Sequence, residues 1–251
     1  MLKTFAGGRL FGECYGQGTA WVLAFHGWMR SHRDFDEVLD GIEAIAVDLP
    51  GFGAAPSPPE GWSTAEYADW VAPVLDEMAP RPVVLGHSFG GRVAAQLAAR
   101  HPDRIGALVL SGVPHLVADG RPGHKPPPGF RLGKALYRRG LIGQDRMEAM
   151  RRRYGSADYR AAEGVMRDVL VKAVNETYGR QLAAYPGPVD LVWGQDDDAA
   201  PVGEAAAALE ACADGRLVTL PGVGHLTPRQ APAALRAAIL RHRPAGSPSM
   251  P

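Results

Sequence analysis

The sequence is poor in several features that would point to particular classes of protein. It has only two cysteines, Cys14 and Cys212, which are far apart and form no CxxC pattern. This excludes a disulfide-rich scaffold and a zinc knuckle. Two reduced thiols are the favoured interpretation, and a single disulfide between them is the alternative. The formal net charge is zero, so the chain lacks the basic excess typical of a nucleic-acid-binding protein.

Long apolar runs are absent as well. No stretch reaches the roughly 18 apolar residues that a membrane-spanning helix needs, and the first residues lack the apolar run of a signal peptide. We therefore expect a soluble, cytoplasmic protein, a monomer or homodimer, with neither a nucleic-acid nor a membrane partner. The 251 residues, 46% of them hydrophobic, suffice for one sizeable domain with a full core.

What the sequence does contain is a series of short apolar runs that end in glycine-rich or proline-rich turns. Most are continuous rather than alternating, as in strands that are buried on both faces of a parallel sheet. Helical patterns separate them, at 64–78 with Ser63 as N-cap, at 89–100 and at 231–241. The sequence therefore predicts an α/β fold. The predicted strands are 21–25, 42–47, 82–85, 105–110, 189–193 and 217–220.

The alternation of strands and helices breaks between about 113 and 187. This stretch holds no good strand but three helical patterns, at 131–139, 145–154 and 157–178. We expect a helical insertion over the carboxyl edge of the sheet, where open α/β sheets bind ligands. The predicted organisation is one domain over 1–243 and a flexible tail over 244–251. The core of that domain comprises about 1–112 and 188–243.

The strongest chemical motif is Gly-x-Ser-x-Gly at 86–90, which lies between an apolar strand and an Ala-rich helix. A nucleophile on such a sharp turn needs small neighbours two positions away, as Gly86 and Gly90 are. The start of the following helix favours developing negative charge. A chance match in a loop would lack these flanking elements. We therefore predict that Ser88 is a nucleophile.

A serine needs a base, and the base needs an acid that orients it. His225 is the candidate base among eight histidines, because it lies between the last predicted strand and the last helix. Three carboxylates, Asp196, Asp197 and Asp198, follow strand 189–193. Spacing alone does not select one of them, since each could instead cap the next helix.

Stabilising an oxyanion requires backbone N–H groups beside the nucleophile. Strand 21–25 runs into His26-Gly27-Trp28, so we predict the N–H groups of Trp28 and Phe89 for this role. An ordinary glycine turn is the alternative for this loop. We also expect three nearby side chains to contact the substrate, namely His26, His87 and Arg30.

Taken together, these residues resemble the α/β-hydrolase superfamily, over about 9–112 and 186–242. The resemblance is carried by five motifs in the right order. They are His26-Gly27-Trp28, Asp48-Leu49-Pro50-Gly51-Phe52-Gly53, the 86–90 elbow, Trp193-Gly194-x-x-Asp197-x-x-x-Pro201 and Gly222-x-Gly224-His225. The fourth motif selects Asp197 as the acid.

The resemblance implies a mostly parallel eight-stranded sheet flanked by helices, with residues 113–187 as a helical cap. It also implies two-step acyl transfer from a small-molecule ester through Ser88, His225 and Asp197, without a cofactor. Two alternatives stay open, because some superfamily members cleave C–C bonds or catalyse eliminations, and others only bind small molecules. The core motifs do not separate these activities.

Two other patterns have competing interpretations. His26, His32, Asp34 and Asp36 could suggest a metal site, but a solvated loop explains them better, and we predict no metal. Between 121 and 153 there are ten Lys or Arg and two acids, Asp145 and Glu148. A solvated helix face is the favoured interpretation. The alternative is that this region, helped by Arg30 and Arg33, attracts an anionic substrate.

Overall fold

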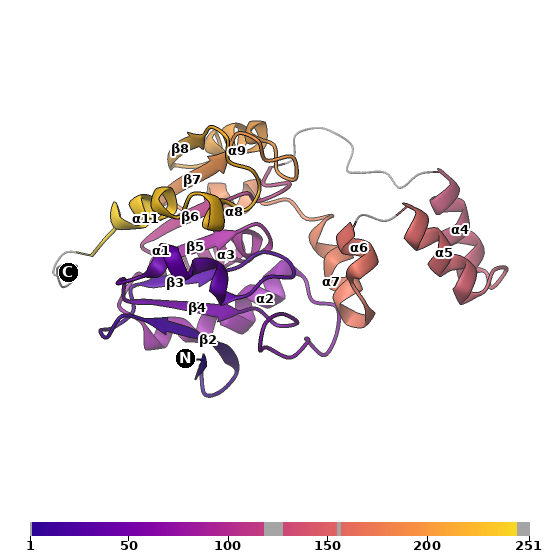
Figure 1. Cartoon of the computed structure of the whole chain (residues 1–251), viewed down its shortest axis with the longest axis horizontal. Coiled ribbons are helices and arrows are strands. Elements are labelled where there is room, and N and C mark those ends of the chain that lie inside the picture. Colours follow the sequence, from indigo (N-terminus) through magenta and orange to yellow (C-terminus); the bar gives the residue numbers. More distant parts are fainter. Residues whose placement is uncertain (1, 118–127, 155–156, 245–251) are drawn as a thin grey trace.

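The computed structural model describes residues 2–117, 128–154 and 157–244, and it contains one eight-stranded sheet (Figure 1). The strand order is β1-β2-β4-β3-β5-β6-β7-β8. β2 pairs antiparallel with both β1 and β4 at one edge. The remaining pairs, among β3 to β8, are parallel. This confirms the predicted mostly parallel sheet. The strands are β1 (Leu2–Phe5), β2 (Leu10–Tyr15), β3 (Val22–Phe25), β4 (Ala44–Asp48), β5 (Val83–His87), β6 (Ala107–Ser111), β7 (Pro188–Gly194) and β8 (Asp214–Leu220).

The six strands predicted from apolar runs are all present as β3 to β8, with ends that differ by a few residues. The two strands that the pattern did not reveal, β1 and β2, form the antiparallel edge. Both are partly exposed, so they lack a continuous apolar run. By contrast, β3 to β6 are buried along their whole length, which explains why their runs are continuous.

Helices cover both faces of the sheet (Figure 1). One face packs against α1 (Asp36–Leu39) and α11 (Pro232–Leu240), and the other against α2 (Thr64–Val71), α3 (Phe89–Arg100) and α9 (Val202–Leu209). Each face carries its own cluster of fully buried side chains. This two-sided burial holds the strand ends, and the loops that follow them, in fixed positions.

The predicted helix 64–78 is shorter than expected, and the reason is a proline. α2 ends at Val71, and a 3-10 helix continues over Ala72–Glu77 with Pro73 in its first turn. Proline has no N–H to donate to the preceding turn, so the regular helix stops there. The predicted N-cap is confirmed, because Ser63 and Glu66 form a reciprocal capping box.

The described part of the segment between β6 and β7 is helical, as predicted, and contains no strand. The predicted helix 157–178 is divided, because Ala162 and Glu163 separate α6 from α7. The helix α8 was not predicted. The helices are α4 (Pro128–Arg138), α5 (Gln144–Tyr154), α6 (Ala157–Ala161), α7 (Gly164–Ala173) and α8 (Gly179–Ala184).

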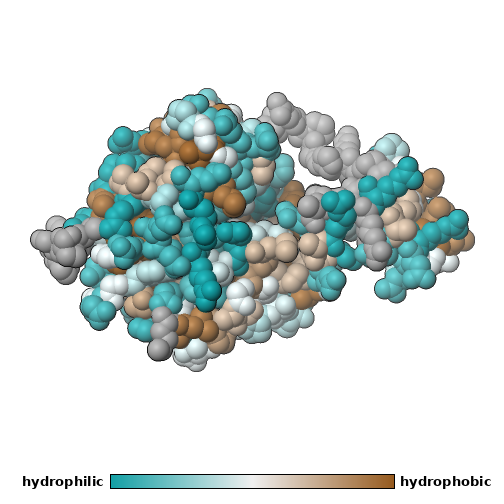
Figure 2. Space-filling view, in the orientation of Figure 1, coloured by the Kyte–Doolittle hydropathy of each residue, from teal (hydrophilic) through white to brown (hydrophobic). Residues whose placement is uncertain are grey.

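These helices differ in how they meet the rest of the molecule. α8 packs against α3, whereas α4 and α5 pack on each other and stand apart from the sheet (Figure 1). Apolar and charged side chains alternate over the α4–α5 pair (Figure 2), and Leu132 and Leu141 are exposed. Of the predicted tail at 244–251, residues 245–251 lie outside the described residues. Both cysteines are free thiols, so the disulfide alternative is wrong. In the described ranges, no helix is long and apolar enough to cross a membrane.

Candidate active site

Ser88 lies on a sharp turn between β5 and α3, with a backbone φ of +51°. A residue with a side chain rarely adopts this conformation, so close packing must hold it there. A Cβ on Gly90 would lie 2.1 Å from the carbonyl oxygen of Phe25, and one on Gly86 would lie 2.5 Å from Cα of Gly91. The turn therefore needs glycine at both positions, as the motif predicted.

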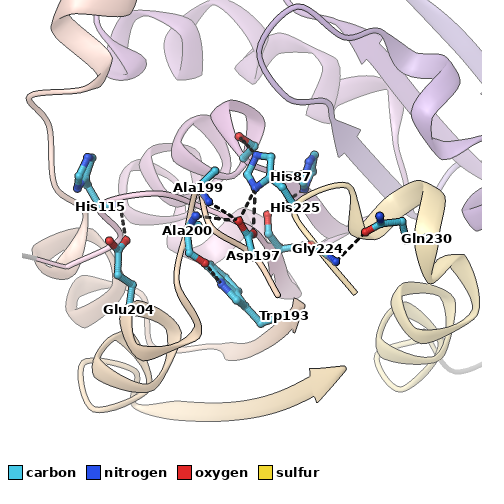
Figure 3. Close-up of polar contacts among 12 residues, drawn as sticks. His87, His115, Trp193, Asp197, Ala199, Ala200, Glu204, Gly224, His225 and Gln230 are labelled. Carbon is cyan, nitrogen blue, oxygen red and sulfur yellow. Dashed lines mark hydrogen bonds and ion pairs between the residues drawn. The ribbon is translucent and has the colours of Figure 1, made fainter. Parts of the chain in front are cut away.

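The residues predicted as nucleophile, base and acid come together at the ends of three strands. Nε2 of His225 lies 3.0 Å from Oγ of Ser88, and its Nδ1 lies 2.9 Å from Oδ2 of Asp197 (Figure 3). A carboxylate accepts from Nδ1–H, which leaves Nε2 unprotonated and able to accept the serine hydroxyl proton. The geometry thus suits proton transfer from Ser88 to His225.

Asp197 differs from its two acidic neighbours in burial. It is 3% exposed, whereas Asp196 and Asp198 are exposed. Its Oδ1 accepts hydrogen bonds from the N–H groups of Ala199 at 2.9 Å and Ala200 at 2.8 Å (Figure 3). The carboxylate is therefore held in one orientation toward His225, and the backbone supplies that orientation.

The loop that carries His225 is held by hydrogen bonds to the short helix α10 (Thr227–Gln230). The N–H of Gly224 donates to Oε1 of Gln230 at 2.9 Å (Figure 3). The N–H of Thr227 donates to the carbonyl of His225 at 2.9 Å. The imidazole is 28% exposed, so one side of the base is open to a substrate.

The two residues whose N–H groups are predicted to stabilise an oxyanion, Trp28 and Phe89, both lie close to the nucleophile. A Cβ on Gly27 would lie 3.3 Å from Cβ of Ser88, which places the Gly27–Trp28 peptide against the serine. Phe89 opens α3, where the first N–H groups of a helix have no partner within it. The Trp28 and Phe89 rings pack edge to face at 5.3 Å.

His26, predicted to contact the substrate, is held by the protein through both ring nitrogens. It is fully buried, its Nδ1 lies 2.7 Å from the carbonyl of Gly27, and its Nε2 accepts from the N–H of Leu49 at 3.0 Å. Burial lowers the pKa of His26 to about 4, so the ring is neutral near pH 7. Nε2 therefore ties the 26–28 loop to the residue that follows β4, and Nδ1 contacts the backbone of its own loop.

His87 is also buried, 1% exposed, beside the candidate base. Its ring centroid lies 5.1 Å from that of His225, and its Nδ1 donates to the carbonyl of Ser111 at 3.1 Å. Burial, and then the neighbouring His225, lower the pKa of His87 to about 3. A neutral imidazole therefore lies next to the position where His225 becomes cationic. Its contact with substrate stays a prediction.

Arg30 forms a bidentate ion pair with Asp34, which the sequence motifs did not predict. Its Nε donates to Oδ2 of Asp34 at 2.6 Å, and its Nη2 donates to Oδ1. This contact raises the pKa of Arg30 further. Arg229 of α10 approaches the same carboxylate. Sequence reasoning missed Asp34 and Arg229 here, because neither lies in a local motif and only the fold joins them.

The residues of the alternative metal site at 26–36 have separate partners in the fold. His32 pairs with Asp48 at 2.9 Å, and Asp34 pairs with Arg30. Among the described residues, no three His, Cys, Asp or Glu side chains come together as metal ligands. Two surface hollows, of about 480 and 650 Å³, are lined by residues from the edge strands and the 31–54 region, and neither includes Ser88.

Solved structures with the same fold include several enzymes of under 25% sequence identity. A bromoperoxidase from Bacillus anthracis matches with a TM-score of 0.70 and 19% identity, over 93% of this chain and 94% of that one. A thermophilic esterase from Thermogutta terrifontis matches at 0.66 and 21%, over 96% and 97%. A meta-cleavage product hydrolase from Pseudomonas fluorescens matches at 0.66 and 18%, over 96% of each chain.

The sequence model of the alpha/beta hydrolase family matches residues 22–238, which is most of the chain. That range begins at β3 and ends in α11, so it includes every strand end at which the site is built. On this match and on the sheet topology, the chain belongs to the alpha/beta hydrolase family.

Proposed function

We propose that the protein hydrolyses a carboxylic ester, or a related acyl bond, of a small molecule through Ser88, His225 and Asp197. The single observation that carries the proposal is the unbroken series of contacts from Asp197 through His225 to Oγ of Ser88. A buried acid, an oriented imidazole and a serine on a strained turn are the components of an activated nucleophile.

The first half-reaction makes an acyl-enzyme. The hydroxyl proton of Ser88 moves to Nε2 of His225 as Oγ bonds to the carbonyl carbon, and the carbonyl electron pair becomes an oxyanion. The N–H groups of Trp28 and Phe89 would stabilise that charge. His225 then gives its proton to the leaving alcohol oxygen as the C–O bond breaks.

The second half-reaction releases the acyl group. His225 takes a proton from a water molecule, whose oxygen bonds to the acyl carbon of the Ser88 ester. The tetrahedral species collapses, the bond to Oγ breaks, and His225 returns its proton to Ser88. Asp197 keeps Nδ1 protonated throughout and stabilises the imidazolium in each step.

The test compares covalent labelling and turnover in the wild type and in Ser88→Ala. Intact-protein mass is measured after incubation with a fluorophosphonate, and turnover is measured on p-nitrophenyl acetate and butyrate. The expected result is one adduct and measurable turnover in the wild type, with both lost in Ser88→Ala. Ser57→Ala, which removes an exposed serine, is the matched control and should behave like the wild type.

Cleavage of a C–C bond is the second candidate, because the same serine or histidine can act as a general base without forming an acyl-enzyme. One of the similar folds belongs to a meta-cleavage product hydrolase. Ring-fission products with a C–C bond next to a carbonyl would then be turned over, and Ser88→Ala would keep part of that activity. An absence of both adduct and turnover in the wild type would instead favour a protein that only binds its ligand.

A further inference from the structure

Two arginines from the two loops around Ser88 meet at one buried carboxylate. Arg30 follows the 26–28 loop, and Arg229 lies in α10, just after His225. Asp34, in the 3-10 turn His32–Phe35, accepts Nε of Arg30 at 2.6 Å and lies 3.7 Å from Nη1 of Arg229. The three charged groups therefore form one cluster, which we call the Asp34 cluster.

The charge that the Asp34 cluster presents to solvent is positive. The Asp34 side chain is 5% exposed, whereas those of Arg30 and Arg229 are 34% and 55% exposed. Asp34 uses only two of the five N–H donors of Arg30, and its 3.7 Å distance to Arg229 is too long for a hydrogen bond. Two guanidinium groups thus face outward, and one carboxylate lies behind them.

This cluster lies next to the nucleophile. The position that a Cβ on Gly27 would occupy is 3.3 Å from Cβ of Ser88 and 3.5 Å from Cγ of Arg30. The stem of Arg30 therefore lies near Ser88. Because Nη1 of Arg229 lies 3.7 Å from the oxygen of Asp34 that accepts Nη2 of Arg30, both guanidinium groups lie on the side of the site formed by the loops at 26–30 and 225–229.

The basic residues of α4 and α5 are a less direct source of attraction for an anion. These helices stand apart from the sheet that carries Ser88 (Figure 1). Salt screens exposed charges beyond about 8–10 Å at physiological ionic strength. Arg30 is partly buried near the nucleophile and is oriented by Asp34, so its charge is screened less, and Arg229 lies next to it.

We propose that Arg30 and Arg229 form a subsite for a carboxylate on the substrate of Ser88, so that the preferred substrates are anionic esters. This inference rests on the proposed function. The two outward guanidinium groups would each donate to the substrate carboxylate, and Asp34 would keep them in place. The competing interpretation is that the cluster only fixes the two loops.

The test uses two pairs of esters that differ only in one charge. The first pair, mono-p-nitrophenyl adipate and its methyl ester, carries the charge on the acyl side. The second pair, para-acetoxybenzoate and its methyl ester, carries it on the leaving group. kcat/KM is measured for the wild type, Arg229→Gln and Arg229→Lys. Arg216→Gln removes the same charge from an exposed residue of β8, outside the cluster, and serves as the matched control.

The expected result is that Arg229→Gln lowers kcat/KM for the anionic ester of at least one pair about tenfold. The neutral ester should change less than about twofold, Arg229→Lys should recover part of the loss, and Arg216→Gln should have no effect. The wild-type preference for the anionic ester should also decrease as salt is added.

Equal losses on the anionic and neutral esters would overturn the subsite, because the cluster would then act only on loop position. No loss on either would overturn it as well. Both outcomes leave the proposed function standing if the wild type hydrolyses the neutral esters and is labelled by a fluorophosphonate. A wild type that does neither contradicts the proposed function itself.

Discussion

The loops at the carboxyl ends of β3, β5 and β7 and the helices α4 and α5 obey different constraints. The loops are bound by close contacts, such as the 2.1 Å that would separate a Cβ on Gly90 from the carbonyl oxygen of Phe25. The helices α4 and α5 are mostly exposed. The residues of these loops therefore have almost no freedom to change, while α4 and α5 can vary in sequence at little cost.

The largest effect should come from Asp197→Asn. An amide in place of the carboxylate can donate to Nδ1 of His225, which would put the proton on Nε2 and remove the base. We expect kcat on a neutral p-nitrophenyl ester to fall on the order of 10⁴-fold with little change in the melting temperature. Asp198→Asn, an exposed neighbour, is the matched control. A similar loss in both variants would mean that charge, rather than the bond to His225, matters.

Gly90→Ala should separate the two regions by stability as well as by activity. The added Cβ would meet backbone that cannot move cheaply, so we expect a loss of about 2–4 kcal/mol in the free energy of unfolding. Gly143→Ala lies in the helical segment with no heavy atom within 4 Å of the new Cβ. It should change stability by less than about 0.5 kcal/mol. Denaturant unfolding of both variants checks this, and equal effects would contradict the comparison.

Acid should destabilise the core through two of its buried histidines, His26 and His87. Because burial lowers the pKa of His26 to about 4 and of His87 to about 3, the unfolded chain binds more protons than the folded one below about pH 6.5. The free energy of unfolding should thus be highest above pH 6.5 and fall by a few kcal/mol toward pH 4.

Denaturant unfolding measured from pH 7.5 to pH 4 follows this loss. His87→Gln should flatten the profile, because glutamine has no proton to gain. His115→Gln removes an exposed histidine and should leave the profile unchanged. A wild-type profile that is flat down to pH 4 would contradict the assignment of neutral, buried rings.

The smallest effect should be at the junction between the regions. Arg92 of α3 is buried, its guanidinium donates to the carbonyl of Ala173 in α7, and burial lowers its pKa. Arg92→Leu would remove this link, and we expect a melting temperature about 2–4 °C lower. Arg131→Leu, on the exposed side of α4, should have no effect. An unchanged melting temperature in Arg92→Leu would show that α7 is held by other contacts.

Much of the core could be predicted from sequence, because burial on both faces forces continuous apolar runs such as the one that became β5. Ser88 and His225 were found because glycines and strand ends mark their loops. Asp197 needed the family motif, since Asp196 and Asp198 have the same local pattern and only burial separates them. The Asp34 cluster was not predictable, because Arg30 and Arg229 are brought together by the sheet order alone.

The environment of His26 was not predictable for a related reason. Its place beside Gly27 suggested contact with substrate, whereas the fold turns its ring toward the N–H of Leu49, which directly follows β4, the strand next to β3. A sequence shows which residues follow a strand, and it does not show which of them point inward.

The most direct measurement of the central claim is the mass of the enzyme during turnover. The wild type is mixed with a p-nitrophenyl ester, quenched in acid within the first turnovers, and digested for peptide mapping. If Ser88 is the nucleophile, the peptide containing Ser88 gains the mass of the acyl group, and Ser88→Ala shows neither the adduct nor turnover. Steady hydrolysis without any adduct, retained in Ser88→Ala, would contradict it.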